Sequence, residues 1–253
     1  MTTHTFNLEL IHPSWRSSIQ ESLKMVDSTY LDTLTHSSEW LPGHGKIFNA
    51  FSVPIDKVKY VLFGESPYPR KESANGYAFW DAAVNEIWSP TGLSKAVNRA
   101  TSLRNLIKML LVAEGLLSEQ DTSQVAISKI DKKSLVQTNN ELFGNFLSKG
   151  FLLLNATPVL QTHSPKIDAR EWRNFTHTLL DNLLKTHPDV KILLLGNIAN
   201  LIDKSISDFP KSQKFYAEHP YNYTFIKNKQ VQEFFKPLHL LLKTRGNLSK
   251  STP

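Results

Sequence analysis

The chain has 253 residues, of which 40% are hydrophobic and 21% charged, a composition typical of one globular protein rather than a disordered or fibrous one. Lysine and arginine number 29 against 23 acidic residues, so the net charge of +6 favours polyanionic partners such as nucleic acid or anionic lipid. The absence of cysteine excludes disulfides, thiolate metal sites and cysteine nucleophiles, and it is compatible with a reducing compartment. Because the N-terminal segment lacks a secretory pattern and no apolar run could span a membrane, we expect a soluble intracellular protein, cytoplasmic or, in a eukaryote, nuclear.

Four short apolar runs predict buried parallel strands. They are Val58 to Phe63, Phe151 to Leu154, Val190 to Leu195 and the weaker Lys214 to Ala217.

Helical patterns alternate with these runs. One begins at Ser102, the expected cap, and stops at Gly115. A second begins near Asp168, which has capping-box spacing to Glu171, and a third runs from about Lys229 to Leu242. Strands that alternate with helices predict an α/β fold with a parallel sheet.

We expect a single domain over residues 1–253. The connections Asp81 to Ala100 and Ser118 to Lys133 are interpreted as surface elaborations, and the tail 246–253 as mobile.

Each predicted strand ends in a polar or conformationally special segment. These segments are Gly64 to Pro69, Asn155 to Pro158, Gly196 to Asn197, and Glu218 to Tyr221. Ligands of open α/β sheets bind beyond the carboxyl ends of the strands, so one site could collect all four loops. Taken singly, each residue also has an ordinary structural interpretation, as a turn, a loop start or a core aromatic.

Together and in order, these segments resemble the uracil-DNA glycosylase family, of the family 1 kind, from about residue 47 to 238. Residues 64–69, Gly-Glu-Ser-Pro-Tyr-Pro, resemble the water-activating loop G-Q-D-P-Y. Residues 76–79 resemble the segment of the stacking phenylalanine, and residues 152–156 the uracil-recognition strand. Leu194 to Gly196 and His219-Pro220 resemble the glycine-serine loop and the DNA-intercalation loop.

This resemblance implies a fold and an activity. The fold is a three-layer α/β/α sandwich around a short central four-stranded parallel sheet. The activity is hydrolysis of the N-glycosidic bond of a uracil flipped out of DNA, without metal or cofactor. The implied partner is uracil-containing DNA, single- or double-stranded, and the protein is expected to be a monomer.

The resemblance also assigns substrate-binding roles. Asn155 would donate to one edge atom of uracil and accept from another, an order that cytosine does not offer. Phe79 would stack on the flipped base, and Tyr68 would exclude the methyl group of thymine. His219 would donate a hydrogen bond to the uracil oxygen as negative charge develops there.

One departure concerns catalysis. Ser66 stands where the family usually has the aspartate that orients water and faces the cationic sugar. Serine can hold water but supplies no charge, a loss on the order of 3–4 kcal/mol by analogy with an oxyanion-hole donor. Glu65, which replaces the usual glutamine, is a candidate catalytic and substrate-binding carboxylate, although neighbouring residues of an extended stretch point to opposite sides. More distant branches of the superfamily also resemble G-E-x-P here, so catalysis is not excluded.

The expected DNA-binding residues are Ser102, Gly196, Asn197, Pro220, Tyr221, Tyr223 and Thr224. Two of the DNA-facing loops that carry them depart from the family pattern as well. Tyr223 stands where a leucine wedge would enter the base stack, and its larger ring could favour single-stranded or distorted DNA. The prolines of the phosphate loop are mostly absent before Ser102, and residues 88–98 look inserted.

Two alternatives remain open at this stage. The chain could be a catalytically silent homologue that binds DNA or a damaged base, which Ser66 motivates. It could also excise another damaged base, with Glu65 and Ser66 responsible for the altered specificity.

Overall fold

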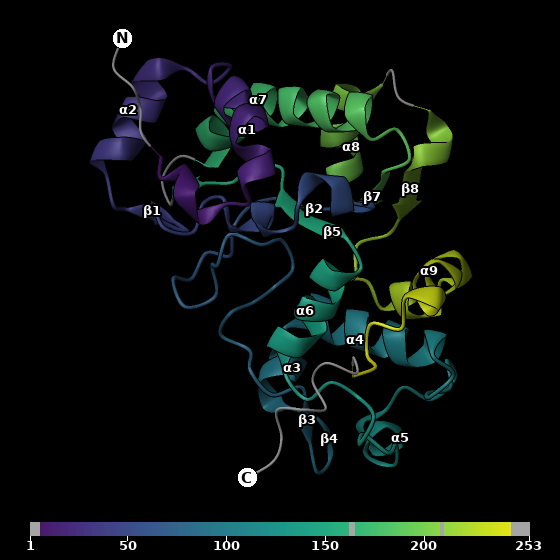
Figure 1. Ribbon diagram of the computed structural model, residues 1–253. Coiled ribbons are helices and arrows are strands. Elements are labelled where there is room, and N and C mark those ends of the chain that lie inside the picture. Colours follow the sequence, from purple (N-terminus) through teal and green to yellow (C-terminus); the bar gives the residue numbers. More distant parts are fainter. Residues whose placement is uncertain (1–5, 162–164, 208–209, 244–253) are drawn as a thin grey trace. The chain divides into compact units, whose positions relative to one another are not determined.

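The computed structural model describes residues 6–161, 165–207 and 210–243 (Figure 1). The chain divides into two compact units, the first formed by Met1–Ala82 and Gly150–Tyr216, the second by Ala83–Lys149 and Ala217–Pro253. The single domain over residues 1–253 stays a prediction.

A four-stranded sheet is the framework of the first unit. Its strands are β2 (Tyr60–Gly64), β5 (Phe151–Asn155), β7 (Lys191–Leu195) and β8 (Lys214–Ala217), in the order β5-β2-β7-β8 (Figure 1). Strand β2 is parallel to both of its neighbours, and all five residues of β5 are buried. The predicted strands and the α/β class with its four-stranded parallel sheet are therefore confirmed.

Helices and short segments surround this sheet. In the first unit they are α1 (Arg16–Leu23), α2 (Ser28–His36), α7 (Pro165–Thr186) and α8 (Ile198–Ile202), the pair β1 (Trp40–Leu41) and β6 (Leu160–Gln161), and the 3-10 helices Leu8–Leu10, Pro13–Trp15, Asn49–Ser52, Ile55–Lys57, Asp203–Ile206 and Lys211–Gln213. Helix α7 packs against α1 and buries the predicted apolar stripe of Trp172, Phe175, Leu179 and Leu183. Each such side chain contributes roughly 1.5–3 kcal/mol through burial.

The predicted capping box at Asp168 is wrong, because α7 begins three residues earlier, at Pro165. Asp168 is fully buried and accepts hydrogen bonds from the Tyr30 hydroxyl, the Gln161 main chain and the Gln161 side chain, each at 2.7 Å. Burial and the Asp168 carboxylate raise the pKa of Tyr30 well above its ordinary value. A buried carboxylate needs such donors, and here they fasten α2 and β6 to α7.

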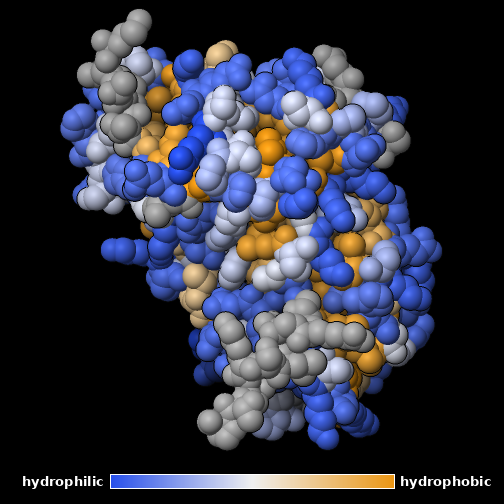
Figure 2. Space-filling model, viewed as in Figure 1, coloured by the Kyte–Doolittle hydropathy of each residue, from blue (hydrophilic) through white to orange (hydrophobic). Residues whose placement is uncertain are grey.

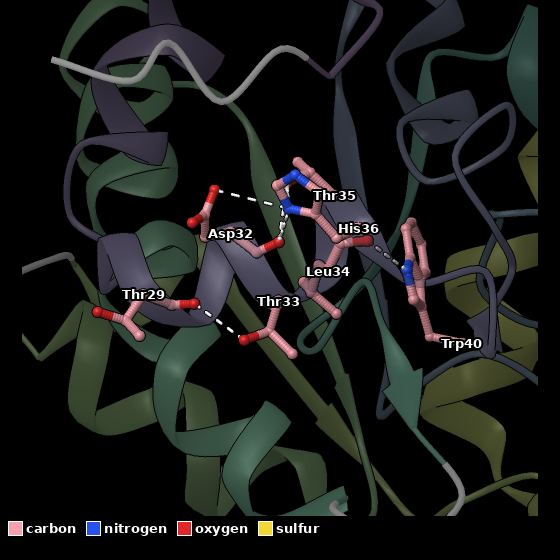
Figure 3. Close-up of polar contacts among 7 residues, drawn as sticks. All are labelled: Thr29, Asp32, Thr33, Leu34, Thr35, His36 and Trp40. Carbon is pink, nitrogen blue, oxygen red and sulfur yellow. Dashed lines mark hydrogen bonds and ion pairs between the residues drawn. The ribbon is translucent and has the colours of Figure 1, made fainter.

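Other polar groups in and after helix α2 are paired locally (Figure 3). The Thr33 hydroxyl donates to the Thr29 carbonyl at 3.0 Å, and Nδ1 of His36 donates to the Asp32 carbonyl at 2.8 Å. The indole N–H of Trp40 donates to the Leu34 carbonyl at 3.0 Å. These bonds leave the apolar face of α2 to pack inward.

The second unit is built mainly of helices. Its elements are β3 (Trp88–Ser89), β4 (Gly92–Leu93), α3 (Lys95–Arg99), α4 (Thr101–Ala113), α5 (Gln124–Ser128), α6 (Asn139–Ser148), α9 (Lys229–Phe235) and the 3-10 helices η7 (Tyr223–Lys227) and η8 (Lys236–Leu238).

Three sequence-based boundaries in this unit need correction. Ser102 lies inside the first turn of α4, whose N-cap is Ala100 without a side-chain cap, so the predicted cap is wrong. Gly115, at a φ of +73°, does end that helix as predicted. Helix α9 ends at Phe235 rather than near Leu242, because Pro237 lacks the N–H that would continue it.

The two connections are more than surface elaborations. The segment from Asp81 to Ala100 crosses from the first unit to the second and forms β3, β4 and α3, with buried side chains such as Ile87 and Val97. The segment from Ser118 to Lys133 contains α5, which buries Ile127. The tail predicted as mobile falls outside the described residues.

The face in Figure 2 is mostly hydrophilic, with apolar residues showing in smaller patches between the hydrophilic ones. Among the described residues, no helix combines the length and the apolar character needed to cross a membrane.

Candidate functional site

The loops that follow β2 and β5 are locked side by side by their main chains. Gly64 pairs with Asn155 at the last register position of the two strands. Beyond the strands the pairing continues, because the Ala156 N–H donates to the Gly64 carbonyl at 2.9 Å and the Thr157 N–H to the Glu65 carbonyl at 3.0 Å. The structure therefore brings the expected recognition and water-activating loops together.

Gly64 is required by its neighbour across the sheet. A Cβ added at Gly64 would lie 2.5 Å from Oδ1 of Asn155 and 2.9 Å from Cβ of Ala78. The missing side chain thus makes room for the amide of Asn155.

The Asn155 side chain is buried but has no partner. Its exposed fraction is 4%, and within the described part of the chain its amide makes no hydrogen bond. Leaving a buried polar group unpaired costs roughly 1–3 kcal/mol, so the Asn155 amide is a candidate ligand-binding group.

Phe79 is held in a strained conformation beside this amide's loop. Its φ is +63°, in the left-handed region, which costs a non-glycine residue roughly 1–3 kcal/mol. The Tyr68 hydroxyl donates to the Phe79 carbonyl at 3.1 Å, and the Ala78 N–H donates to the Leu153 carbonyl of β5 at 3.0 Å. These bonds fix Phe79 relative to both loops. Burial, followed by the charge of Asp81, raises the pKa of Tyr68 well above its ordinary value, so its hydroxyl stays protonated and can donate.

The two residues that depart from the family pattern differ in exposure. Ser66 is half-buried, whereas Glu65 is exposed. Serine, rather than the neighbouring carboxylate, is therefore the more enclosed polar side chain of this loop.

The sequence did not reveal an ion pair, called the brace below, that joins these loops. Asp81 is 3% exposed, and its Oδ2 lies 3.4 Å from the Arg70 guanidinium. The pair joins the end of the Ser66 loop to the end of the Phe79 loop. An aspartate directly after three aromatic or apolar residues carries no sequence signal for this role.

Gly196 and Asn197 follow β7, also in the first unit. Gly196 turns the chain at a φ of +74°, and Asn197 precedes α8 without using its side chain as a cap. The exposed amide of Asn197 is therefore available to a ligand.

The loop that carries His219 belongs to the second unit and is held from α4. The Asn105 amide donates to the Pro220 carbonyl at 2.7 Å and to the Tyr221 carbonyl at 3.2 Å. Asn105 is 1% exposed, and an asparagine buried in the middle of an apolar helix face was the signal that could have identified it.

The same loop fixes which ring nitrogen of a neutral His219 carries the proton. The Tyr221 N–H donates to Nδ1 of His219 at 3.1 Å, and the Asn222 N–H donates to the His219 carbonyl at 2.9 Å. A neutral imidazole whose Nδ1 accepts carries its proton on Nε2. A neutral His219 therefore carries its N–H donor on Nε2.

The remaining expected DNA-binding residues lie on α4 and the His219 loop. Ser102 is half-buried, Pro220 is buried, and Tyr221, Tyr223 and Thr224 are exposed. The Tyr223 hydroxyl lies 3.1 Å from that of Thr122.

The structure thus gathers Ser66, Tyr68, Phe79 and Asn155 in the first unit and places His219 in the second. Their union in one pocket stays a prediction. Across the described residues, no group of three or more histidine and acidic side chains is arranged to hold a metal ion.

Comparison with known proteins supplies relatives along most of the chain. No family model matches it. A uracil-DNA glycosylase of Porphyromonas gingivalis is 30% identical over 198 residues, which cover 75% of this chain and 74% of the relative. A uracil-DNA glycosylase of Mesomycoplasma hyopneumoniae is 24% identical over 246 residues, 96% of this chain and 95% of the relative. The crystal structure of UNG from Nitratifractor salsuginis has 41% identity and a TM-score of 0.87, covering 92% of this chain and 94% of that one.

The fold, the loops at the strand ends and these relatives define the class as DNA N-glycosylases, the hydrolases that begin base excision repair. The chain belongs to the uracil-DNA glycosylase family. The resemblance found in its sequence is confirmed.

Proposed function

We propose that this chain flips uracil out of single- or double-stranded DNA and hydrolyses its N-glycosidic bond at a reduced rate, leaving an abasic site. The observation that carries the proposal is the Asn155 amide, buried, unpaired and seated against Gly64. The protein is proposed to act as a monomer inside the cell, without metal or cofactor.

Recognition rests on the two ends of that amide. The amide oxygen accepts from N3–H of uracil, and the amide nitrogen donates to O4. Cytosine has an acceptor at N3 and a donor at its 4-amino group. The oxygen of a fixed Asn155 amide would therefore face an acceptor, and its nitrogen would face a donor. A site that leaves its own polar groups unpaired with the wrong base rejects that base strongly.

The walls of the pocket complete the selection. Phe79 stacks on the flipped base, a contact worth roughly 1–3 kcal/mol. Tyr68 stands at the C5 edge and excludes the methyl group of thymine by steric contact. Its hydroxyl donates to Phe79, so the two rings keep a fixed relation.

Hydrolysis breaks the bond between C1′ and N1, and the bonding electrons leave with uracil. The Nε2–H of His219 donates to the uracil oxygen on which negative charge develops. The Ser66 hydroxyl holds the water whose oxygen bonds to C1′, and the proton of that water passes to solvent or to the departing base. Glu65, which is exposed, contributes a negative charge at longer range.

Ser66 limits the rate in this scheme. It positions water but offers no charge to the cationic sugar. The expected loss of about 3–4 kcal/mol corresponds to a rate roughly 100- to 1000-fold below that of a site with aspartate.

The test is excision from an oligonucleotide with a single uracil, scored as alkali-labile abasic sites in single-stranded and duplex form. We expect slow product formation by the parent chain and a further loss on the order of 100-fold or more in Asn155→Ala. Absence of product from both substrates at high enzyme concentration would overturn the proposal.

Ser66 also favours a second function, that of a homologue that binds a flipped base without excising it. In that case DNA binding would persist in the parent chain while Ser66→Asp alone released uracil. A panel of oligonucleotides with other modified bases separates both functions from an altered specificity.

A further inference from the structure

Two exposed tyrosines follow His219, and the family pattern points to the second of them as the residue that enters DNA. Tyr221 is 67% exposed and Tyr223 is 52% exposed. A side chain that intercalates enters the base stack with its tip. The contacts that the tip of each tyrosine makes within the protein therefore indicate which of the two can enter DNA.

The tip of Tyr223 is anchored to the protein. Its hydroxyl lies 3.1 Å from the hydroxyl of Thr122, whose exposed fraction is only 5%. The ammonium group of Lys227 lies 5.7 Å from the centre of the Tyr223 ring. To intercalate, Tyr223 would have to leave both partners.

This anchor belongs to a longer seam between two segments of the second unit, residues 114–122 and residues 223–239. Along the seam, Lys229 contacts Glu119 at 2.6 Å, and Nδ1 of His239 lies 3.0 Å from Glu114. The hydrogen bond of Lys229 lowers the pKa of Glu119, as expected for an ion pair. Tyr223 is therefore one contact of an interface that holds η7 and α9 to the end of α4.

Tyr221 shows the opposite arrangement. Its main chain is fixed at both ends, because its N–H donates to His219 and its carbonyl accepts from Asn105. Within the described part of the chain, its ring makes no hydrogen bond, ion pair or ring contact. A fixed main chain with an exposed ring suits an inserted side chain, because little main-chain entropy remains to be lost and no contact within the protein has to be broken.

We propose that Tyr221 is the residue that enters the base stack and fills the space of the flipped nucleotide, while Tyr223 is a structural anchor of the loop. The assignment rests on the proposed function for its DNA substrate. It moves the wedge two residues towards His219 relative to the leucine position of the family.

The experiment uses the full chain and a duplex with a tetrahydrofuran abasic analogue flanked by 2-aminopurine, whose fluorescence reports stacking at the gap. Tyr221→Ala is expected to remove most of the fluorescence change and to lower uracil excision from duplex about tenfold or more, the size of one aromatic–base stacking contact. Tyr223→Ala is expected to keep the fluorescence change and to lose about threefold or less in duplex excision.

Thermal unfolding supplies the complementary measurement. Tyr223→Phe and Thr122→Val each remove the same hydrogen bond, so both are expected to lower the Tm while keeping the fluorescence change. Tyr221→Ala is expected to leave the Tm within about one degree of the parent, because its ring has no partner in the fold.

The proposal is overturned if Tyr223→Ala removes the fluorescence change as fully as Tyr221→Ala, or if Tyr221→Ala keeps it. The analogue duplex requires no excision. A parent chain that releases no uracil would therefore contradict the proposed function, while the fluorescence comparison would still decide between the two tyrosines.

Discussion

The recognition loops of the first unit and the His219 loop of the second unit are positioned by different kinds of bond. In the first unit, main-chain hydrogen bonds extend the pairing of β2 and β5 past the strands, so the sheet itself fixes the position of Asn155. In the second unit, side chains hold the loop, chiefly the amide of Asn105. The recognition loops are therefore held as firmly as the sheet, whereas the position of the His219 loop depends on a few side chains.

The largest expected effect concerns the contribution of His219, in the second unit, to catalysis. His219→Ala removes the donor that faces the developing charge on uracil, so we expect the single-turnover rate to fall about 100- to 1000-fold. His36→Ala, an exposed histidine on α2, is the matched control and should retain the parental rate. Equal rates for the parent and His219→Ala would remove His219 from the mechanism.

The next effect tests the rigidity of the first region. In Gly64→Ala the new Cβ would meet Oδ1 of Asn155, and a displacement near 1 Å costs up to about 100-fold in rate. Gly45→Ala is the control, because its Cβ would meet nothing within 4 Å. If excision by Gly64→Ala matched that by Gly45→Ala, the Asn155 amide would not be the recognition group.

Asn105→Ala tests how far the second region depends on one side chain. Losing the amide leaves two main-chain carbonyls without their donor, so the free energy of unfolding should fall by about 1–3 kcal/mol and duplex excision by roughly tenfold. Urea unfolding and the excision assay measure the two effects. An unchanged rate together with lower stability would show that the loop keeps its shape without Asn105.

The smallest effect concerns Asp203, which ties the segment after α8 to β8. The Tyr216 hydroxyl and the Lys214 ammonium group lie 2.6 Å and 2.9 Å from its carboxylate, and the bond from Tyr216, followed by that from Lys214, lowers the pKa of Asp203. Because the pKa of Asp203 is lower in the folded protein than in the unfolded chain, its ionised carboxylate stabilises the fold at pH values above the unfolded-state pKa. This stabilisation is lost as the pH falls through the folded-state pKa. We therefore expect Asp203→Asn to be less stable than the parent at pH 7, by at most about 1 kcal/mol because the group is half exposed, and the difference to shrink as the pH is lowered. Urea unfolding at pH 7 and over a series of acidic pH values provides the measurement, and a difference that did not shrink with falling pH would contradict this account.

The sequence was sufficient for the sheet because three of its strands contain continuous apolar runs bounded by special residues, while the fourth, Lys214–Ala217, is weaker and has no buried residue. Tyr68, Phe79 and Asn155 were named through the resemblance of their segments to the family, and their roles stay predictions. The sequence failed at the cap of α7, because Asp168 is bound by Tyr30 of α2, 138 residues away in the chain, and by Gln161 of β6, seven residues earlier.

The same reason explains what was missed in the site. The Arg70–Asp81 brace and the Asn105 contact join residues whose relation exists only after folding. Tyr223 was expected to be the wedge from its place in the loop, but its anchor on Thr122 depends on a segment about 100 residues earlier in the chain.

The rate ratio between Ser66→Asp and the parent chain tests the central claim most directly, measured under single-turnover conditions on a single-stranded uracil oligonucleotide. The account predicts that the aspartate raises the maximal rate by about 100- to 1000-fold and leaves the substrate concentration at half-maximal rate unchanged, because recognition by Asn155 is intact and only the water-activating position lacks its charge. A Ser66→Asp rate equal to or below that of the parent chain would contradict it.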